Sequence, residues 1–367
     1  MPFGRIWAHR CWKKSLSDLP DDRRKKKMMT RYGQIQIADS GLFRRHLNGS
    51  GISPYLQEKL VFPGQSEVCD QAAQVTQTLP GLLVASSQIY RLTNHYGAAI
   101  EADLDQPVVT DQPPVGIVYM QADGAMILTD GGYRENKVSR IFNAAALKQS
   151  PVAEHIDSSL FTAHLVTAAD FTTKFRPHSD ACRLLGADLV FIGDGATWLR
   201  QLMTTHYPQA TLILDLYDVM SYAGQVGMAA YRTRSSQHKW IEEQRKLLLN
   251  SELDLVLTHI KALRIKVDLR DSVCNYLEAN RDRMDYGGYQ KRGLLIGSGA
   301  IESAESAHRT VVQKRLKRSG QRWSLAGSQH VLNLRTCFVS QRRELVRKHI
   351  EPVNYAMAAQ RQFELQP

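Results

Sequence analysis

Three acidic side chains, far apart in the sequence, have surroundings that suit a shared metal site. Asp123 and Asp194 each close an apolar run and precede a glycine, and Glu302 follows a Gly-Ser-Gly turn. Apolar runs without helical spacing predict buried strands. A carboxylate at the end of such a strand lies at the rim of the sheet, where open α/β folds bind their ligands. Three carboxylates brought together repel one another unless cations neutralise them, so we predict a divalent-metal site.

The chemistry that such a site suits is the cleavage and transfer of phosphodiesters. This reaction needs an activated oxygen nucleophile and neutralisation of the charge on the leaving oxygen. Two Mg²⁺ or Mn²⁺ ions roughly 3.5–4 Å apart supply both, and carboxylates are their natural ligands. In this hypothesis Asp123 bridges two ions, while Asp194 and Glu302 each hold one. Gly124 and Gly195 leave space for a phosphate to approach.

Each of the three acids also has a purely structural explanation. Asp-Gly is a common turn dipeptide, so Asp123 and Asp194 can simply end strands. Glu302 lies near the start of a predicted helix, where the helix dipole favours an acid whatever its role. The order Asp, Asp, Glu on strand, strand and late helix favours the catalytic interpretation.

A sheet must position these acids, and the apolar runs predict its strands. We expect strands at residues 115–124, 133–145, 159–166, 188–194 and 210–215. Helices are expected before the fourth strand and between the fourth and fifth. Three strands in sequence, then alternating helices and strands, predict an α/β fold with a ribonuclease H-like mixed β-sheet and flanking helices.

The remaining regions differ in composition from this predicted core. We expect a basic arm and short strand at 1–50, a helical region at 51–105, the catalytic core at 115–219 and 286–340, an all-helical insertion at 220–285 and a basic tail at 341–367. Within the second region, two helices flank a Pro-Gly break and resemble a helix-turn-helix that binds DNA. Arg91 and Asn94 on its second helix are candidates for DNA contact, although any two packed helices give a similar pattern.

The positive charge of the chain is clustered. The formal net charge is +11, and residues 309–348 contain eleven Lys and Arg with one acid. Such clustering favours a polyanionic partner, because each neutralised phosphate releases counterions. The alternative is a solvated helix face. The candidate DNA-binding cations are Arg309, Arg315, Lys317, Arg318 and Arg322. Trp323 either stacks on an unpaired base or packs in the core, and Trp240 has the same two interpretations.

Other classes of protein are disfavoured. The five cysteines form no C-x-x-C pair, which argues against a zinc knuckle or a disulfide framework. No apolar stretch approaches the roughly 20 residues that span a bilayer, and the N-terminus has no secretory signal pattern. We therefore expect a cytoplasmic, nucleoid-associated protein with no membrane contact.

Several segments resemble the DDE transposases of bacterial insertion sequences, in particular those of the ISKra type. The most specific are residues 297–304, 315–324 and 331–335; residues 123–142 and 193–198 resemble the regions of the first and second Asp. The resemblance implies a ribonuclease H-like core with an Asp-Asp-Glu triad at Asp123, Asp194 and Glu302. It also implies metal-dependent cleavage and strand transfer at terminal inverted repeats and target DNA, by a homo-oligomer on DNA.

The chain departs from that family at the fifth strand. Those transposases usually carry a His three residues after the acid there, whereas this chain has Asp215 and Asp218. We expect both acids to support the site. The N-terminal region also lacks the cysteine pairs of many such transposases. Two alternatives to a transposase remain open: a catalytically inactive, transposase-derived DNA-binding protein, and a ribonuclease H-like nuclease.

Overall fold

The computed structural model describes residues 25–30, 33–38, 52, 54–79, 81–107, 116–149, 154–184, 186–297 and 308–350. The contacts divide the chain into two units. One comprises residues 1–96 with 344–367, and the other comprises residues 97–343. None of the described helices is long and apolar enough to cross a membrane.

The first unit contains a hairpin and helices. Strands β1 (Lys25–Thr30) and β2 (Gly33–Ala38) pair antiparallel, and α2 (Pro54–Ser66), α3 (Cys69–Thr78) and α4 (Ser86–Ala99) follow. We expected a basic arm and a short strand in this region, and the lysine-rich run at residues 25–30 is itself one strand of the hairpin. Helices α3 and α4 lie on either side of the Pro-Gly break, as predicted. On α4, Ile89 and Leu92 are buried and Arg91 is exposed.

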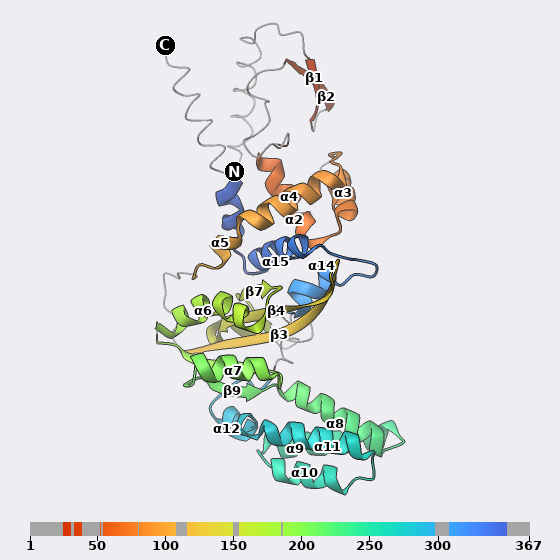
Figure 1. Ribbon diagram of the computed structural model, residues 1–367, viewed down its shortest axis with the longest axis vertical. Coiled ribbons are helices and arrows are strands. Elements are labelled where there is room, and N and C mark those ends of the chain that lie inside the picture. Colours follow the sequence, from red (N-terminus) through yellow and green to blue (C-terminus); the bar gives the residue numbers. More distant parts are fainter. Residues whose placement is uncertain are drawn as a thin grey trace. The chain divides into compact units, whose positions relative to one another are not determined.

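The second unit is built on a five-stranded mixed sheet (Figure 1). Its strands are β3 (Ile117–Thr129), β4 (Gly132–Asn143), β7 (Leu160–His164), β8 (Asp188–Gly193) and β9 (Thr211–Leu214), in the spatial order β7-β4-β3-β8-β9. The first three pair antiparallel, whereas β8 and β9 continue parallel to β3. A small separate hairpin is formed by β5 (Leu147–Gln149) and β6 (Glu154–Ile156). The prediction of a mixed α/β sheet is confirmed.

The first strand is longer than the sequence predicted. We expected it to end at Asp123 and Gly124, but β3 continues to Thr129 because it pairs with β4 along its whole second half. The side chains of a strand alternate between its two faces. Asp123 therefore shares a face with Tyr119 and Ile127, which are both buried.

The two faces of this sheet are covered by different elements. Helices α6 (Ala168–Leu184) and α7 (Thr197–His206) pack against the face that carries Val118, Met120 and Phe191. The opposite face has two apolar clusters. One surrounds Tyr119 and the other surrounds Ile127, so Asp123 lies between them along the strand.

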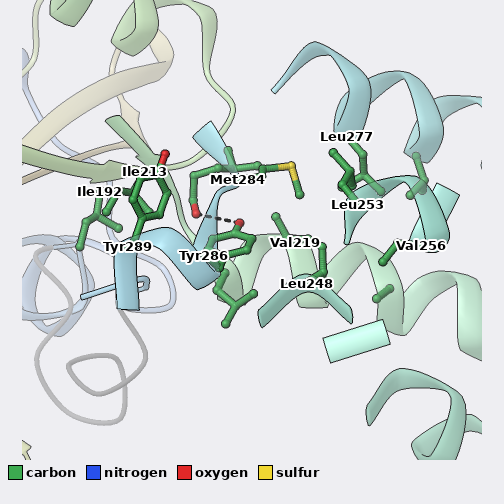
Figure 2. Close-up of a cluster of buried hydrophobic side chains, with 14 of the residues drawn as sticks. Ile192, Ile213, Val219, Leu248, Leu253, Val256, Leu277, Met284, Tyr286 and Tyr289 are labelled. Atoms are coloured by element: carbon green, nitrogen blue, oxygen red, sulfur yellow. Dashed lines mark hydrogen bonds between the residues drawn. The ribbon is translucent and has the colours of Figure 1, made fainter. Parts of the chain in front are cut away.

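The segment that follows β9 is helical, as predicted, and packs against the sheet. It contains α8 (Leu216–Ala230), α9 (Arg234–Leu249), α10 (Leu253–Ala262), α11 (Val267–Ala279), the 3-10 turn η3 (Arg281–Arg283) and α12 (Tyr286–Lys291). Figure 2 shows its apolar side chains in one cluster with Ile192 and Ile213 of the sheet. The hydroxyls of Tyr286 and Tyr289 donate to the carbonyls of Leu214 and Leu212, 2.9 and 3.1 Å away, which covers the edge strand. Trp240 is buried in this cluster, so it is a core residue.

The C-terminal part of the second unit covers the second half of β3. It comprises the π-helix η4 (His308–Gln313), α14 (Lys314–Leu316) and α15 (Leu325–Val339). Val311 and Leu332 pack with Ala125 and Ile127. The guanidinium of Arg335, on α15, is buried and donates to the carbonyls of η4, including that of Val311 at 3.3 Å.

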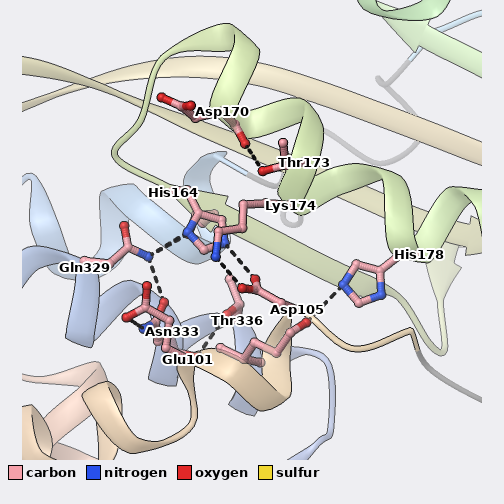
Figure 3. Close-up of polar contacts among 12 residues, drawn as sticks. Glu101, Asp105, His164, Asp170, Thr173, Lys174, His178, Gln329, Asn333 and Thr336 are labelled. Carbon is pink, nitrogen blue, oxygen red and sulfur yellow. Dashed lines mark hydrogen bonds and ion pairs between the residues drawn. The ribbon is translucent and has the colours of Figure 1, made fainter. Parts of the chain in front are cut away.

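A polar network attaches the first residues of the second unit to the sheet edge (Figure 3). Asp105, just after α5 (Glu101–Leu104), pairs with Lys174 and lies 3.9 Å from Nε2 of His164. The ring of His178 bonds to the carbonyl of Leu104 at 3.1 Å. Both histidines are buried, and burial is the main reason that the pKa of each falls to about 4. Their neutral forms therefore belong to the folded state.

We expect this network to make the fold sensitive to acid. Histidine in the unfolded chain titrates near pH 6.5, so stability is lost as the pH falls from about 6.5 towards 4, by about 2 kcal/mol per histidine at pH 5. Urea unfolding at pH 7.5 and 5 measures the loss. In the His164→Gln variant, the loss of unfolding free energy between the two pH values should be smaller by the contribution of one histidine, about 2 kcal/mol. An unchanged loss in this variant would contradict the assignment.

Candidate metal and nucleic-acid site

The pairing of β3 with β8 brings two of the predicted acids together. The last residues paired in this parallel ladder are Ala122 and Gly193, and Asp123 and Asp194 are the next residues on each strand. The pKa of Asp123 is raised, mainly because burial disfavours its charged form, and the charge of Asp194 raises it further. The backbone N–H of Gly124 opposes this rise by donating to the Asp123 carboxylate.

The negative charges of the two carboxylates are offset by few hydrogen bonds and by no ion pair among the described residues. Asp123 accepts from the N–H of Gly124 at 2.6 Å, and Asp194 accepts from the N–H of Ala196 at 2.9 Å. Within the described part of the chain, neither forms an ion pair with Lys or Arg, and Lys317 acts on Asp123 only as a nearby charge. Two neighbouring carboxylates with unused lone pairs fit Mg²⁺ or Mn²⁺.

The third predicted acid, Glu302, lies outside the described residues. Across the described ranges, no group of three His, Cys, Asp or Glu side chains is arranged as a metal site. The described residues on either side of the Glu302 segment contact the sheet of the second unit or the start of the helix that follows it. The carbonyl of Ile296 accepts from the N–H of Leu216, just after β9, and Val311 packs with Ile127 of β3.

The prediction of open space beside Gly124 and Gly195 is wrong. A Cβ added at Gly124 would lie 2.3 Å from the carboxylate of Glu135, and one added at Gly195 would lie 2.4 Å from the ring of Tyr276. Both positions are therefore filled by side chains of the protein. Glu135 in turn forms an ion pair with Lys137, 2.5 Å away, which is buried on β4.

The two acids after the fifth strand occupy different positions. Asp215 is buried and caps α8 by accepting from the N–H of Tyr217 at 2.9 Å, so its described contacts are structural. Asp218 is partly buried one turn into the helix. The charges of Asp218 and Asp194 both contribute to the raised pKa of Tyr276, after the larger effect of burial. Asp218 is thus a neighbour of the site.

Two of the predicted DNA-binding residues pack against each other: Arg315 is buried and Trp323 is partly buried. Arg315 is buried, and its guanidinium lies 4.8 Å from the centre of the Trp323 ring. The indole N–H of Trp323 donates to the carbonyl of Leu316 at 3.1 Å, and its backbone is bonded to Leu128 and Asp130 at the end of β3. Burial of Arg315 therefore disfavours the phosphate contact that we expected of it, whereas base stacking by the partly buried Trp323 stays a prediction.

The other predicted DNA-binding cations differ in their exposure. Lys317 is exposed beside Asp123, and Arg318 is partly buried, with its Nε donating to the carbonyl of Lys314 at 3.1 Å. Arg322 is exposed and lies 3.5 Å from Asp130. The side chain of Arg309 lies outside the described residues. Lys317 and Arg322 are therefore the described side chains of this set that are most available to a phosphate.

Comparisons with known proteins do not extend the resemblance seen in the sequence. No protein-family model and no curated protein sequence matches the chain. The motifs and the geometry of the two carboxylates are therefore the observations that indicate a function.

The structure adds residues to the site that the sequence did not indicate. Tyr276 and Arg283, from the helical segment, both lie close enough to Asp194 for its charge to influence their pKa values. Neither belongs to a motif, and their approach depends on how the helices pack. Lys137 and Glu135 lie in a segment that resembles transposases. Only the pairing of β4 with β3 shows that both residues lie beside Gly124.

We expect Arg315 to stabilise the fold, whereas Arg322 lies at the surface and should contribute little to stability. Removing the buried guanidinium of Arg315 leaves a space against the Trp323 ring, so Arg315→Ala should lower the free energy of unfolding by about 2–4 kcal/mol. Arg322→Ala is the matched control and should change it by less than about 0.5 kcal/mol. Urea unfolding measures both, and equal effects would contradict this distinction.

Proposed function

We propose that this chain is a DDE-type DNA transposase, which cleaves and transfers DNA strands at the ends of an insertion sequence with the help of divalent metal ions. The observation that carries this proposal is the adjacency of Asp123 and Asp194, each one residue beyond the last paired position of β3 and β8. A turn dipeptide alone does not require that two acids meet at the same level of a sheet.

The order of the elements supports a ribonuclease H-like core. Three antiparallel strands come first in the chain, and two parallel strands follow, separated by α7. The helical segment then separates the fifth strand from the Glu302 region, as the sequence pattern predicts. We propose Glu302 as the third acid of the triad, since the described chain on either side of its segment lies beside β9 and β3.

The residues of the site have separate tasks in this mechanism. When bound, two Mg²⁺ or Mn²⁺ ions would activate water or a 3′-hydroxyl and neutralise the leaving oxygen. Asp123 and Asp194 would hold these ions, and a bound cation would favour the ionised form of Asp123, which burial and the charge of Asp194 disfavour. Lys317, beside Asp123, would hold a DNA phosphate next to the reacting bond.

The helices of the first unit provide the second part of the proposal. Arg91 is exposed on α4, which follows the Pro-Gly break and is the second helix of the pair. In a helix-turn-helix this second helix presents the recognition side chains. We propose that this helix contacts the terminal inverted repeat, and that a homo-oligomer pairs two such ends.

Asp123→Ala should abolish Mg²⁺-dependent cleavage of a duplex that carries the inverted repeats flanking the gene, because it removes a carboxylate that would hold the metal ions. Binding to this duplex should persist, because positively charged side chains contact the DNA phosphates and Asp123 is not one of them. Strand cleavage on a denaturing gel and binding by fluorescence anisotropy measure the two effects.

Asp130→Asn is the matched control, because Asp130 is an exposed acid on the same hairpin, and it should cut normally. Cleavage by Asp123→Ala at the wild-type rate would refute the assigned site. Salt-sensitive binding by the wild-type protein without any cleavage would favour the inactive DNA-binding protein. Cleavage of random duplex at the same rate would favour a nuclease.

Lys317→Gln should weaken DNA binding about equally for all sequences and lower the slope of log K against log salt by about 1, because it removes one phosphate contact. Lys261→Gln, an exposed lysine on α10, is the control and should leave the slope unchanged. Anisotropy titrations at several salt concentrations give the slopes. If both variants behave alike, Lys317 has no specific contact with DNA.

A further inference from the structure

The turn that carries Asp194 is held by the helical segment. Arg200, on α7, donates from Nη1 to the carbonyl of Ala279 at 2.7 Å, and its Nη2 pairs with Asp282 at 2.8 Å. These contacts join the helix that follows Asp194 to the end of α11 and to η3. The β8–α7 turn is therefore attached to a segment that begins only after the next strand.

Tyr276, on α11, contacts this turn directly. A Cβ added at Gly195 would lie 2.4 Å from Cε2 of Tyr276 and 3.0 Å from its hydroxyl, so the ring rests against the glycine that follows Asp194. The ring itself is fixed by Tyr222 of α8, whose centroid is 4.3 Å away. The carbonyl of Tyr276 also accepts from Nδ2 of Asn280 at 2.8 Å.

A buried cation lies next to this ring. Arg283 is 2% exposed, and its guanidinium donates to Oδ1 of Asn280. Its Nε has no hydrogen-bond partner, and within the described residues no carboxylate forms an ion pair with it. Burial, and then the charge of Arg200, lower the pKa of Arg283, whereas the charges of Asp282 and Asp194 partly offset this. A buried guanidinium without an ion pair is costly.

We propose that Tyr276 is a positioning residue for the metal site: with Arg200, it holds the Gly195 turn so that the Asp194 carboxylate faces Asp123. This inference rests on the proposed function and extends it, because it makes the helical segment a required part of the site. Asp194 lies beyond the paired part of β8, so the sheet alone does not fix its carboxylate. A metal site needs its ligands held to within about 0.5 Å, and the Tyr276 ring supplies that restraint.

The test is the binding of Mn²⁺ to the full chain without DNA, measured by electron paramagnetic resonance of free Mn²⁺, together with the Mg²⁺ dependence of end cleavage. Tyr276→Ala should raise the Kd for Mn²⁺ about tenfold, the size of effect seen when groups that orient metal ligands are removed. It should raise the Mg²⁺ concentration for half-maximal cleavage in parallel. Tyr276→Phe keeps the ring and should restore both values.

Tyr231→Ala is the matched control. Tyr231 is a partly buried tyrosine of the same segment, at the far end of α8 from Asp215, and this helix is about 22 Å long. It should leave Mn²⁺ binding unchanged. An unchanged Kd in Tyr276→Ala, or an equal loss in Tyr231→Ala, would overturn the positioning role.

Two further variants keep the outcomes separate. Arg200→Ala, whose side chain is 39% exposed, should fold and should also weaken Mn²⁺ binding. If Tyr276→Ala does not fold, normal binding in Arg200→Ala overturns the inference. Asp123→Ala tests the proposed function itself: if it binds Mn²⁺ as the wild type does, the metal site is wrong, whereas a defect confined to Asp123→Ala rejects only the role of Tyr276.

Discussion

The parallel register between β3 and β8 is the constraint on which the site depends. The ladder stops at Ala122 and Gly193, so the next residue on each strand is an acid at the same level of the sheet. A shift by one residue would turn one of the two side chains to the opposite face. This register is itself fixed by apolar packing, since Val118 and Phe191 must both face α6 and α7. The hydrophobic pattern thus determines where two like charges meet.

The position of Asp123 within β3 explains its environment. Its face of the sheet is apolar on either side, around Tyr119 and around Ile127. Each side has its own cover, the helical segment after β9 and the C-terminal elements η4 and α15. Asp123 lies at the division between these two covers. Burial and then the charge of Asp194 raise the pKa of Asp123, so this carboxyl is a weaker acid than usual.

The sequence predicted β3 and β8 well because each begins as an apolar run that an acid follows. It did not predict the second half of β3, since Met126 and Leu128 face outward on a hairpin that only pairing with β4 extends. It assigned Arg315 to DNA because charge is visible in a sequence, while burial against Trp323 is not. The approach of Tyr276 to Gly195 had no signal at all, because it depends on the packing of α11 against a turn some 80 residues earlier.

The helical segment departs from the sheet and returns to it at nearly one point. It starts at Asp215, and a Cβ added at Gly297 would lie 2.9 Å from Oδ1 of that residue. A segment whose ends meet in this way can be inserted without disturbing the sheet that it interrupts. Such an insertion has no need to reach back to the β8–α7 turn, yet α11 does so through Tyr276 and Ala279. The sheet therefore does not require the contacts that Tyr276 and Ala279 make with this turn and with α7. In our proposal these contacts fix the orientation of Asp194.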